Sequence, residues 1–419
     1  MTTRRTFIST SLGVAVLGGS LPMALVRAAA AQPLPSLGSS VDPRNVLVVI
    51  QMAGGNDGLN TVVPYTDDAY HRVRPVIRIN ESTVLRLDDR IGLNPAMAPL
   101  LELFKEGHVA LVQGVGYPNP NRSHFEATQI WETAATDRPT ATGWLGRYLD
   151  RVAPSATPGR SVLATNGAPI DFTAVALGDQ VPTALLAQHV DVPAIGGLGS
   201  FAYAGGKDIA SKHSAGVLFD GARPGQSPYL ALIEQTARAA FHGGDILRQK
   251  TAGYKPMATY PKDNLSNQLA LAAQIIGSDV GARVIFVTIG SFDTHSDQVG
   301  QQNRLLGYLA GGLNAFYKDL DAHGDAGRVL TMTFSEFGRR VQQNASNGTD
   351  HGTAMPLFVV GGRVKGGVYG DHPSLSDLDS GDLKYHTDFR SVYATVLRDW
   401  LGRDPADVIA GTFDTLPFV

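Results

Sequence analysis

Five apolar runs rich in β-branched residues constrain the fold of this 419-residue chain more than any other feature. They lie at residues 46–51, 109–113, 283–289, 329–334 and 356–360. Their hydrophobicity is continuous rather than alternating, which is typical of strands buried on both faces of a parallel sheet. Between them, apolar residues recur at helical spacing, most clearly over 305–320 and 389–400. This order predicts an α/β fold with a doubly wound, mostly parallel sheet and helices on both faces.

The N-terminus carries the pattern of an export signal. Arg4 and Arg5 are paired, an apolar stretch over 7–26 follows, and a run of small residues at 28–31 ends it. This pattern is typical of a twin-arginine signal peptide that is cleaved near residue 31. The stretch is short and broken by Pro22, which argues against a retained membrane anchor. We therefore expect export by the twin-arginine machinery to the periplasm or the extracellular space.

The same patterns divide the chain into segments. We predict a signal peptide over 1–31, a linker over 32–44 and one α/β domain over 45–419. Within this domain, residues from about 150 to 262 are rich in Gly, Ala and Pro loops. Such a segment is expected to be an insertion that caps the core and shapes access to the sheet edge.

Composition excludes several kinds of site and partner. The chain has no cysteine, so any metal must be held by oxygen and imidazole ligands. A net charge of -3 with 17% charged residues provides no basic field for nucleic acid. No segment after the signal is apolar over a length that spans a bilayer, so we expect no stable membrane insertion after cleavage. A small ligand is the expected partner.

Polar residues follow the apolar runs at the positions where a parallel sheet builds its ligand sites. The candidates, in chain order, are Asp57, Arg122, Ser123, Asp293, His295, Glu336 and His351. Asp293 and His295 stand two residues apart in a Gly/Ser loop, where they have little to do for packing. The sequence thus predicts carboxylate, hydroxyl and imidazole groups at one edge of the sheet, suited to binding a metal or a substrate.

Each of the other candidates has a structural alternative. Asp57 stands in an Asn-Asp-Gly sequence that suits a tight turn. Ser123 could be the N-cap of the helical segment that follows it. Glu336 could pair at the surface with a nearby arginine, and His351 could be an ordinary loop histidine.

The motifs around these residues resemble a known family. They are Gly-Gly-Asn56-Asp57-Gly-Leu-Asn, Arg122-Ser123-His124-Phe125, Phe292-Asp293-Thr-His295-Ser, Ser335-Glu336-Phe-Gly-Arg339, Asp350-His351-Gly and Asp388-Phe-Arg390-Ser-Val. Together they resemble the exported bacterial family catalogued as domain of unknown function 1501, from about residue 45 to the C-terminus. That family is similar to the alkaline phosphatase and sulfatase superfamily, in which two metal ions flank a Ser or Thr nucleophile at the carboxyl edge of the sheet.

The resemblance implies roles for residues of a first metal site. Asp57 resembles the first-strand aspartate that ligates one ion, and Ser123 stands where the superfamily keeps its nucleophile. Arg122 is the nearest candidate to hold anionic oxygens of the substrate. Glu336 stands in place of an aspartate, and Phe337 replaces the histidine that follows it. With only oxygen ligands, this site favours Mg, Ca or Mn over Zn, or stays empty.

A second site is implied by Asp293, His295 and His351, although the superfamily usually separates the first two by more residues. Such a centre implies an exported metal-dependent hydrolase of a small-molecule or polymer ester. A phosphate ester is favoured over a sulfate ester, because a chain without cysteine lacks the commoner route to the formylglycine nucleophile of sulfatases. The alternative is a non-catalytic secreted binding or assembly protein that retains the phosphatase-like fold.

Replacing Arg4 and Arg5 together with Lys should leave the precursor in the cytoplasm, because the paired arginines address the twin-arginine machinery. Fractionation of cells that express either form checks this. Undiminished export of the double-Lys variant would assign the protein to the general secretory route.

Overall fold

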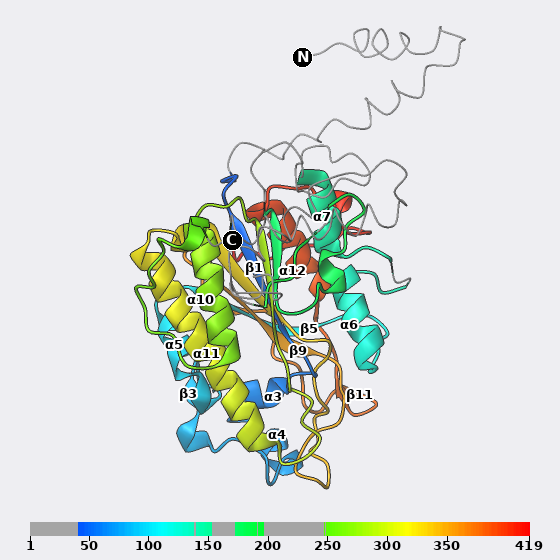
Figure 1. The fold of residues 1–419 in the computed structure, drawn as a ribbon. Helices are drawn as coiled ribbons and strands as arrows, with labels where there is room; N and C mark the ends of the chain where they lie inside the picture. The colour runs from blue at the N-terminus through cyan, green and yellow to red at the C-terminus, as the bar shows by residue number, and fades with distance from the viewer. Residues whose placement is uncertain (1–40, 138–139, 153–171, 191, 197–246, 248) are drawn as a thin grey trace, which may run out of the picture. The chain divides into compact units, whose positions relative to one another are not determined.

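The central strand β1 (Val46–Met52) is buried along its whole length, as its continuous apolar sequence predicts. The computed structural model describes residues 41–137, 140–152, 172–190, 192–196, 247 and 249–419 (Figure 1). Side chains alternate between the two faces of the strand. Val48 and Ile50 enter the core on one face, and Leu47 and Val49 enter the core on the other.

In the described part of the chain, β1 lies within an eight-stranded sheet. The strand order is β10 (Gly367–Tyr369), β5 (Val109–Gly116), β9 (Met355–Gly361), β8 (Val329–Phe334), β1, β7 (Val284–Ile289) and β6 (Ala174–Leu177), with β13 (Thr387–Asp388) also paired to β5. All five predicted strands are present. Every pairing is parallel except those of β9 with β5 and β8. The predicted mostly parallel sheet is confirmed.

Strand β9 runs against its two neighbours, and this determines where its preceding loop lies. Its first residue, Met355, pairs with Val115 near the end of β5, whereas its last, Gly361, pairs with Leu330 near the start of β8. The loop before β9 therefore lies at the same edge as the loops that follow β5 and β8.

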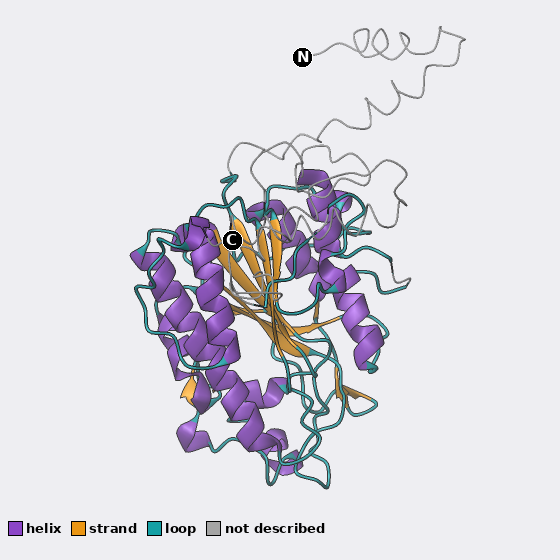
Figure 2. Ribbon diagram, in the orientation of Figure 1, coloured by secondary structure: helices purple, strands orange, loops and turns teal. Residues whose placement is uncertain are grey.

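Helices cover both faces of the sheet (Figures 1 and 2). On one face lie α5 (Ala98–Lys105), α10 (Asn264–Gly277) and α11 (Gln298–Ala322). On the other lie α6 (His124–Thr133), α7 (Trp144–Val152) and α12 (Phe389–Thr395), which continues as a wider turn over Val396–Trp400. The apolar stripes over 305–320 and 389–400 form the buried sides of α11 and α12, so the doubly covered sheet is confirmed as well.

Smaller elements lie around the main sheet. They are α3 (Gly58–Thr61), α4 (Asp68–Val73), a three-stranded sheet of β2 (Val62–Val63), β4 (Gly92–Leu93) and β3 (Leu85–Arg86), and the hairpin of β11 (Leu378–Asp379) with β12 (Asp382–Leu383). Short 3₁₀ turns occur at Glu81–Thr83, Pro95–Met97, Thr183–Leu185, Ala326–Arg328 and Pro405–Asp407.

Several predicted segments lie outside the described residues. These are the signal peptide over 1–31, residues 32–40 of the linker over 32–44, and most of the insertion over 150–262. Their boundaries stay predictions. Among the residues that are described, no helix combines the length and apolar character needed to cross a membrane.

A buried ion pair braces the loop after β1. The carboxylate of Asp57 caps α3 by accepting the Leu59 N–H at 3.2 Å, and it receives Arg74 Nη1 at 2.6 Å. Neither side chain is exposed. Arg74 also donates to the backbone carbonyls of Arg340 and Val341 at 2.8 and 2.9 Å, so it ties the loop after β1 to the segment after β8.

Replacing Arg74 by Met should lower the free energy of unfolding by about 3–5 kcal/mol, since the buried Asp57 carboxylate loses its counter-charge. Urea denaturation monitored by circular dichroism measures the change. Adding Asp57→Asn should recover most of the loss, because the buried charge is then removed from both partners.

A matched control is Arg72→Met. Arg72 is an exposed arginine in the last turn of α4, the helix that Arg74 directly follows, and its replacement should change stability by no more than about 0.5 kcal/mol. An equally small change for Arg74→Met would show that the buried pair does not brace the loop.

Candidate functional site

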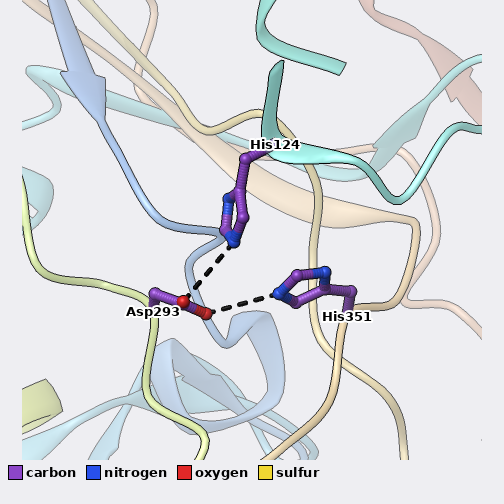
Figure 3. A group of neighbouring side chains, drawn as sticks. All are labelled: His124, Asp293 and His351. Carbon is purple, nitrogen blue, oxygen red and sulfur yellow. Dashed lines mark hydrogen bonds and ion pairs between the residues drawn. The ribbon is translucent and has the colours of Figure 1, made fainter. Parts of the chain in front are cut away.

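Three imidazoles converge on one carboxylate at the edge where β5, β7 and β8 end. His295 Nε2 and His351 Nε2 lie 3.1 and 3.3 Å from Asp293 Oδ1. His124 Nε2 lies 3.5 Å from Asp293 Oδ2 (Figure 3). The two imidazole nitrogens of His295 and His351 are only 2.9 Å apart. Four potential ligand atoms therefore face one small region.

The loop after β7 positions Asp293, and it depends on a glycine in the loop after β1. Gly54 has a φ of +118°, and a Cβ at this position would lie 2.4 Å from the Asp293 backbone nitrogen. The Phe292 N–H donates to the Ala53 carbonyl at 3.1 Å, which joins the two loops directly. Only glycine permits this backbone conformation together with this close approach.

Each imidazole has its Nδ1 beside an oxygen acceptor. The pairs are His124 with Glu336 Oε1 at 2.8 Å, His351 with the Arg122 carbonyl at 2.9 Å, and His295 with Asp350 Oδ1 at 3.2 Å. A neutral imidazole that donates from Nδ1 carries its lone pair on Nε2. All three rings are thus held so that Nε2 faces Asp293, which is the arrangement seen in histidines that ligate metals.

A buried arginine holds the carboxylate from behind. Arg339 Nη2 lies 2.6 Å from Asp293 Oδ1, and its side chain has no exposed surface. The guanidinium also donates to the backbone carbonyls of Gly54, Gly55, Phe292 and Thr349, and its Nη1 lies 3.5 Å from His295 Nε2. Burial is the largest single cause and raises the pKa of Asp293, but the causes that lower it, led by the hydrogen bond and charge of Arg339, give a net lowered pKa.

Two other groups beside Asp293, namely His351 and Asp350, also have lowered pKa values. Burial lowers the pKa of His351. The hydrogen bond from Asn344 is the main cause that lowers the pKa of Asp350. Near neutral pH the site therefore presents ionised carboxylates and a neutral His351, the protonation states in which these groups bind a metal.

The donor set fits a divalent cation. One ligand atom each from His124, Asp293 and His351 lies within 4.8 Å of the others. His124 Nε2 is buried and has no hydrogen-bond partner among the described residues. Around the three imidazoles, the carboxylates of Asp293, Glu336 and Asp350 outnumber the one guanidinium in contact, that of Arg339, by two charges. Imidazole nitrogen with one carboxylate suits zinc and other transition metals.

The structure brings together three of the residues selected from the sequence, Asp293, His295 and His351. It does not bring Asp57 to them, because that carboxylate is engaged by Arg74, by Gln298 and by the Leu59 amide. Glu336 reaches the group through His124. The structural alternative for Glu336, a surface pairing with a nearby arginine, does not occur, since Glu336 is buried and bonded to His124 and the Gly54 amide.

Ser123 and Arg122 lie next to the site in sequence, just before α6. Ser123 occupies the N-cap position, but its hydroxyl makes no cap hydrogen bond and the residue is exposed. The guanidinium of Arg122 is paired with the buried carboxylate of Asp382, and its carbonyl is the acceptor for His351. Arg122 thus contributes to the site through its backbone, while its side chain is held by Asp382.

Sequence reasoning did not select His124, Arg339 or Asp350 as site residues. All three stand within the quoted family motifs: His124 and Asp350 are each next to a selected residue, and Arg339 stands three residues after Glu336. The available signal was their position in the loops that follow β5 and β8 and in the loop that precedes β9, all at this edge of the sheet. Which neighbour in a motif points inward depends on packing that the sequence pattern does not carry.

Comparison with solved structures gives distant similarities. The C-terminal periplasmic domain of EcEptC from Escherichia coli has 10% identity and a TM-score of 0.38, with 90% of each chain covered. The PsFucS1 sulfatase from Pseudoalteromonas sp. has 10% identity and a TM-score of 0.39, with 94% of this chain and 73% of that chain covered. The lipoteichoic acid synthase LtaP from Listeria monocytogenes has 9% identity and a TM-score of 0.37, with 91% and 79% covered.

No curated protein matches the chain. A family model does match it, over the part that contains Asp293, His295, Glu336 and His351. Residues 231–415 match the family described as "Protein of unknown function (DUF1501)", which confirms the family resemblance that the motifs predicted.

Proposed function

We propose that this protein is a metal-dependent hydrolase of a phosphate ester, with a sulfate ester as the less favoured substrate. One observation carries the proposal: the Nε2 atoms of His124, His295 and His351 face the carboxylate of Asp293 at the edge of the sheet where the loops gather. This arrangement has no evident use in packing, because Asp293 and His295 are both about half exposed.

The residues that would hold the ion are Asp293, His124 and His351, and His295 Nε2 lies beside them, 2.9 Å from His351 Nε2. A divalent ion bound here supplies Lewis-acid polarisation of the ester and lowers the pKa of a coordinated hydroxyl or water. The chain itself contributes orientation: Arg339 holds Asp293, and the acceptors at each Nδ1 hold the rings. Because these contacts are already made, the ligand atoms need little rearrangement to bind.

Ser123 is the proposed nucleophile. Its hydroxyl oxygen forms the bond to phosphorus, the P–O bond to the alcohol breaks, and the alcohol leaves with the proton that the hydroxyl loses. Water then attacks phosphorus, which releases phosphate and returns a proton to the serine. The absence of a cap hydrogen bond supports this role over the structural one, because the hydroxyl is not committed to the helix. The residue directly precedes His124, so the nucleophile and a ligand share the start of α6.

The proposal includes export. The twin-arginine pattern at Arg4 and Arg5 directs folded proteins out of the cytoplasm, which would allow a metal to be acquired before export. Esters outside the cytoplasm, whether small molecules or polymers, would then be the substrates.

Replacing His124, Asp293 or His351 singly by Ala should lower both the bound metal and the melting temperature, because lost ligands remove binding free energy that is linked to folding. Elemental analysis and calorimetry of the purified protein measure the two. His108→Ala is the matched control, since this histidine directly precedes β5 at the opposite end of that strand. Unchanged metal content in all three variants would rule the site out.

Ser123→Ala should reduce turnover of aryl phosphates by about 10³-fold or more while leaving metal content and stability unchanged. Aryl phosphodiester and aryl sulfate substrates are assayed in parallel to define the ester class. Ser346→Ala, an exposed serine in the loop before β9, provides the control. Turnover retained in Ser123→Ala would discard the nucleophile assignment, and a wild-type protein inert on every ester would discard the hydrolase.

A further inference from the structure

Glu336 is a buried carboxylate with one oxygen, Oε1, in contact with two neighbouring nitrogens. It follows β8, and its side chain is 3% exposed. Oε1 accepts the Gly54 N–H at 2.8 Å and lies 2.8 Å from His124 Nδ1, while the Ser335 hydroxyl lies 3.3 Å from Oε2. These contacts offset the cost of burying the charge.

His124 is fixed on several sides. Its ring packs against the rings of Phe337 and His351, with centroids 4.9 and 4.4 Å away. With Nδ1 directed at Glu336, its Nε2 is left buried and without a hydrogen-bond partner in the described part of the chain, 3.5 Å from Asp293. A buried nitrogen lone pair in this position is costly unless something binds it.

We propose that Glu336 is a positioning residue: it gives no oxygen to the metal and holds His124 in the tautomer that presents Nε2 to it. This inference rests on the metal centre of the proposed function. It replaces the role of Glu336 as a direct ligand that the family resemblance implied. The group of ligand atoms that lie within 4.8 Å of one another comes from His124, Asp293 and His351 and does not include Glu336, whose Oε1 instead contacts the Gly54 amide and His124 Nδ1.

Phe337 supports the same assignment. It stands where the resemblance expects a metal-binding histidine, and its ring instead lies against His124 and His351, with centroids 4.9 and 4.6 Å away. The pair Glu336 and Phe337 therefore clamps His124 from two directions. We expect one ion per chain, bound by imidazoles that are held in place. Glu336 and Phe337 orient His124, and the acceptors at Nδ1 orient the other rings.

A double-mutant cycle on Zn²⁺ affinity tests the role, using the full mature chain stripped of metal and titrated with Zn²⁺ alone. Glu336→Leu removes both acceptor oxygens and should weaken binding by about 10–100-fold. Glu336→Gln keeps one oxygen for Gly54 and His124, so its loss should be less than about 10-fold. In a His124→Ala background, Glu336→Leu should have no further effect, because its action passes through the missing ring.

Equal weakening by Glu336→Leu in both backgrounds would show that Glu336 does not act through His124 and would overturn the positioning role. A second measurement does not depend on any Glu336 variant folding. ¹⁵N spectra of histidine-labelled apo protein, assigned with His124→Gln, should show the Nδ1–H tautomer for His124. An Nε2–H tautomer would also overturn the proposal.

These readouts are independent of ester turnover. A protein that binds Zn²⁺, passes the cycle and hydrolyses no ester would refute the proposed hydrolase and retain the positioning role. An active enzyme that fails the cycle would refute only the role of Glu336.

Discussion

The buried guanidinium of Arg339 is the interaction on which the site depends. It follows β8, and its donors reach the loops after β1 and β7 and the loop before β9, through the carbonyls of Gly54, Gly55, Phe292 and Thr349. A buried guanidinium is costly unless its donors have acceptors. Because Arg339 donates to all three loops, it fixes their positions relative to one another. The same guanidinium pairs with Asp293, the carboxylate at which the imidazoles meet.

Strand direction explains why one histidine comes from before a strand and the others from after one. In a wholly parallel sheet, a loop that precedes a strand lies at the opposite edge from the loops that follow its neighbours. Because β9 is antiparallel to β5 and β8, the segment with Asp350 and His351 returns to the edge that carries His124 and Asp293. An isolated bridge between Arg339 and His351 then fixes the register of the two loops.

The sequence was sufficient for the sheet, for α11 and α12, and for the meeting of Asp293, His295 and His351, because strand-end positions follow from hydrophobic runs. It was not sufficient for Asp57, whose carboxylate turns to Arg74, 17 residues later in the chain. No local pattern encodes that pairing. The role of His124 could not be predicted for a related reason: the direction of its side chain, in the first turn of α6, depends on how the helix packs.

The three carboxylates around the imidazoles are each held by a donor that is not a histidine. Arg339 holds Asp293, the Gly54 amide holds Glu336, and Asn344 Nδ2 lies 3.2 Å from Asp350. The carboxylates are therefore placed by the fold, and they orient the rings of His124 and His295, while the Arg122 carbonyl orients the ring of His351. Because these side chains are already ordered in the folded protein, binding an ion costs little further conformational entropy. The same contacts explain why several charged residues are stable together at this half-exposed edge of the sheet. The donors that hold the loops in place also stabilise the carboxylates.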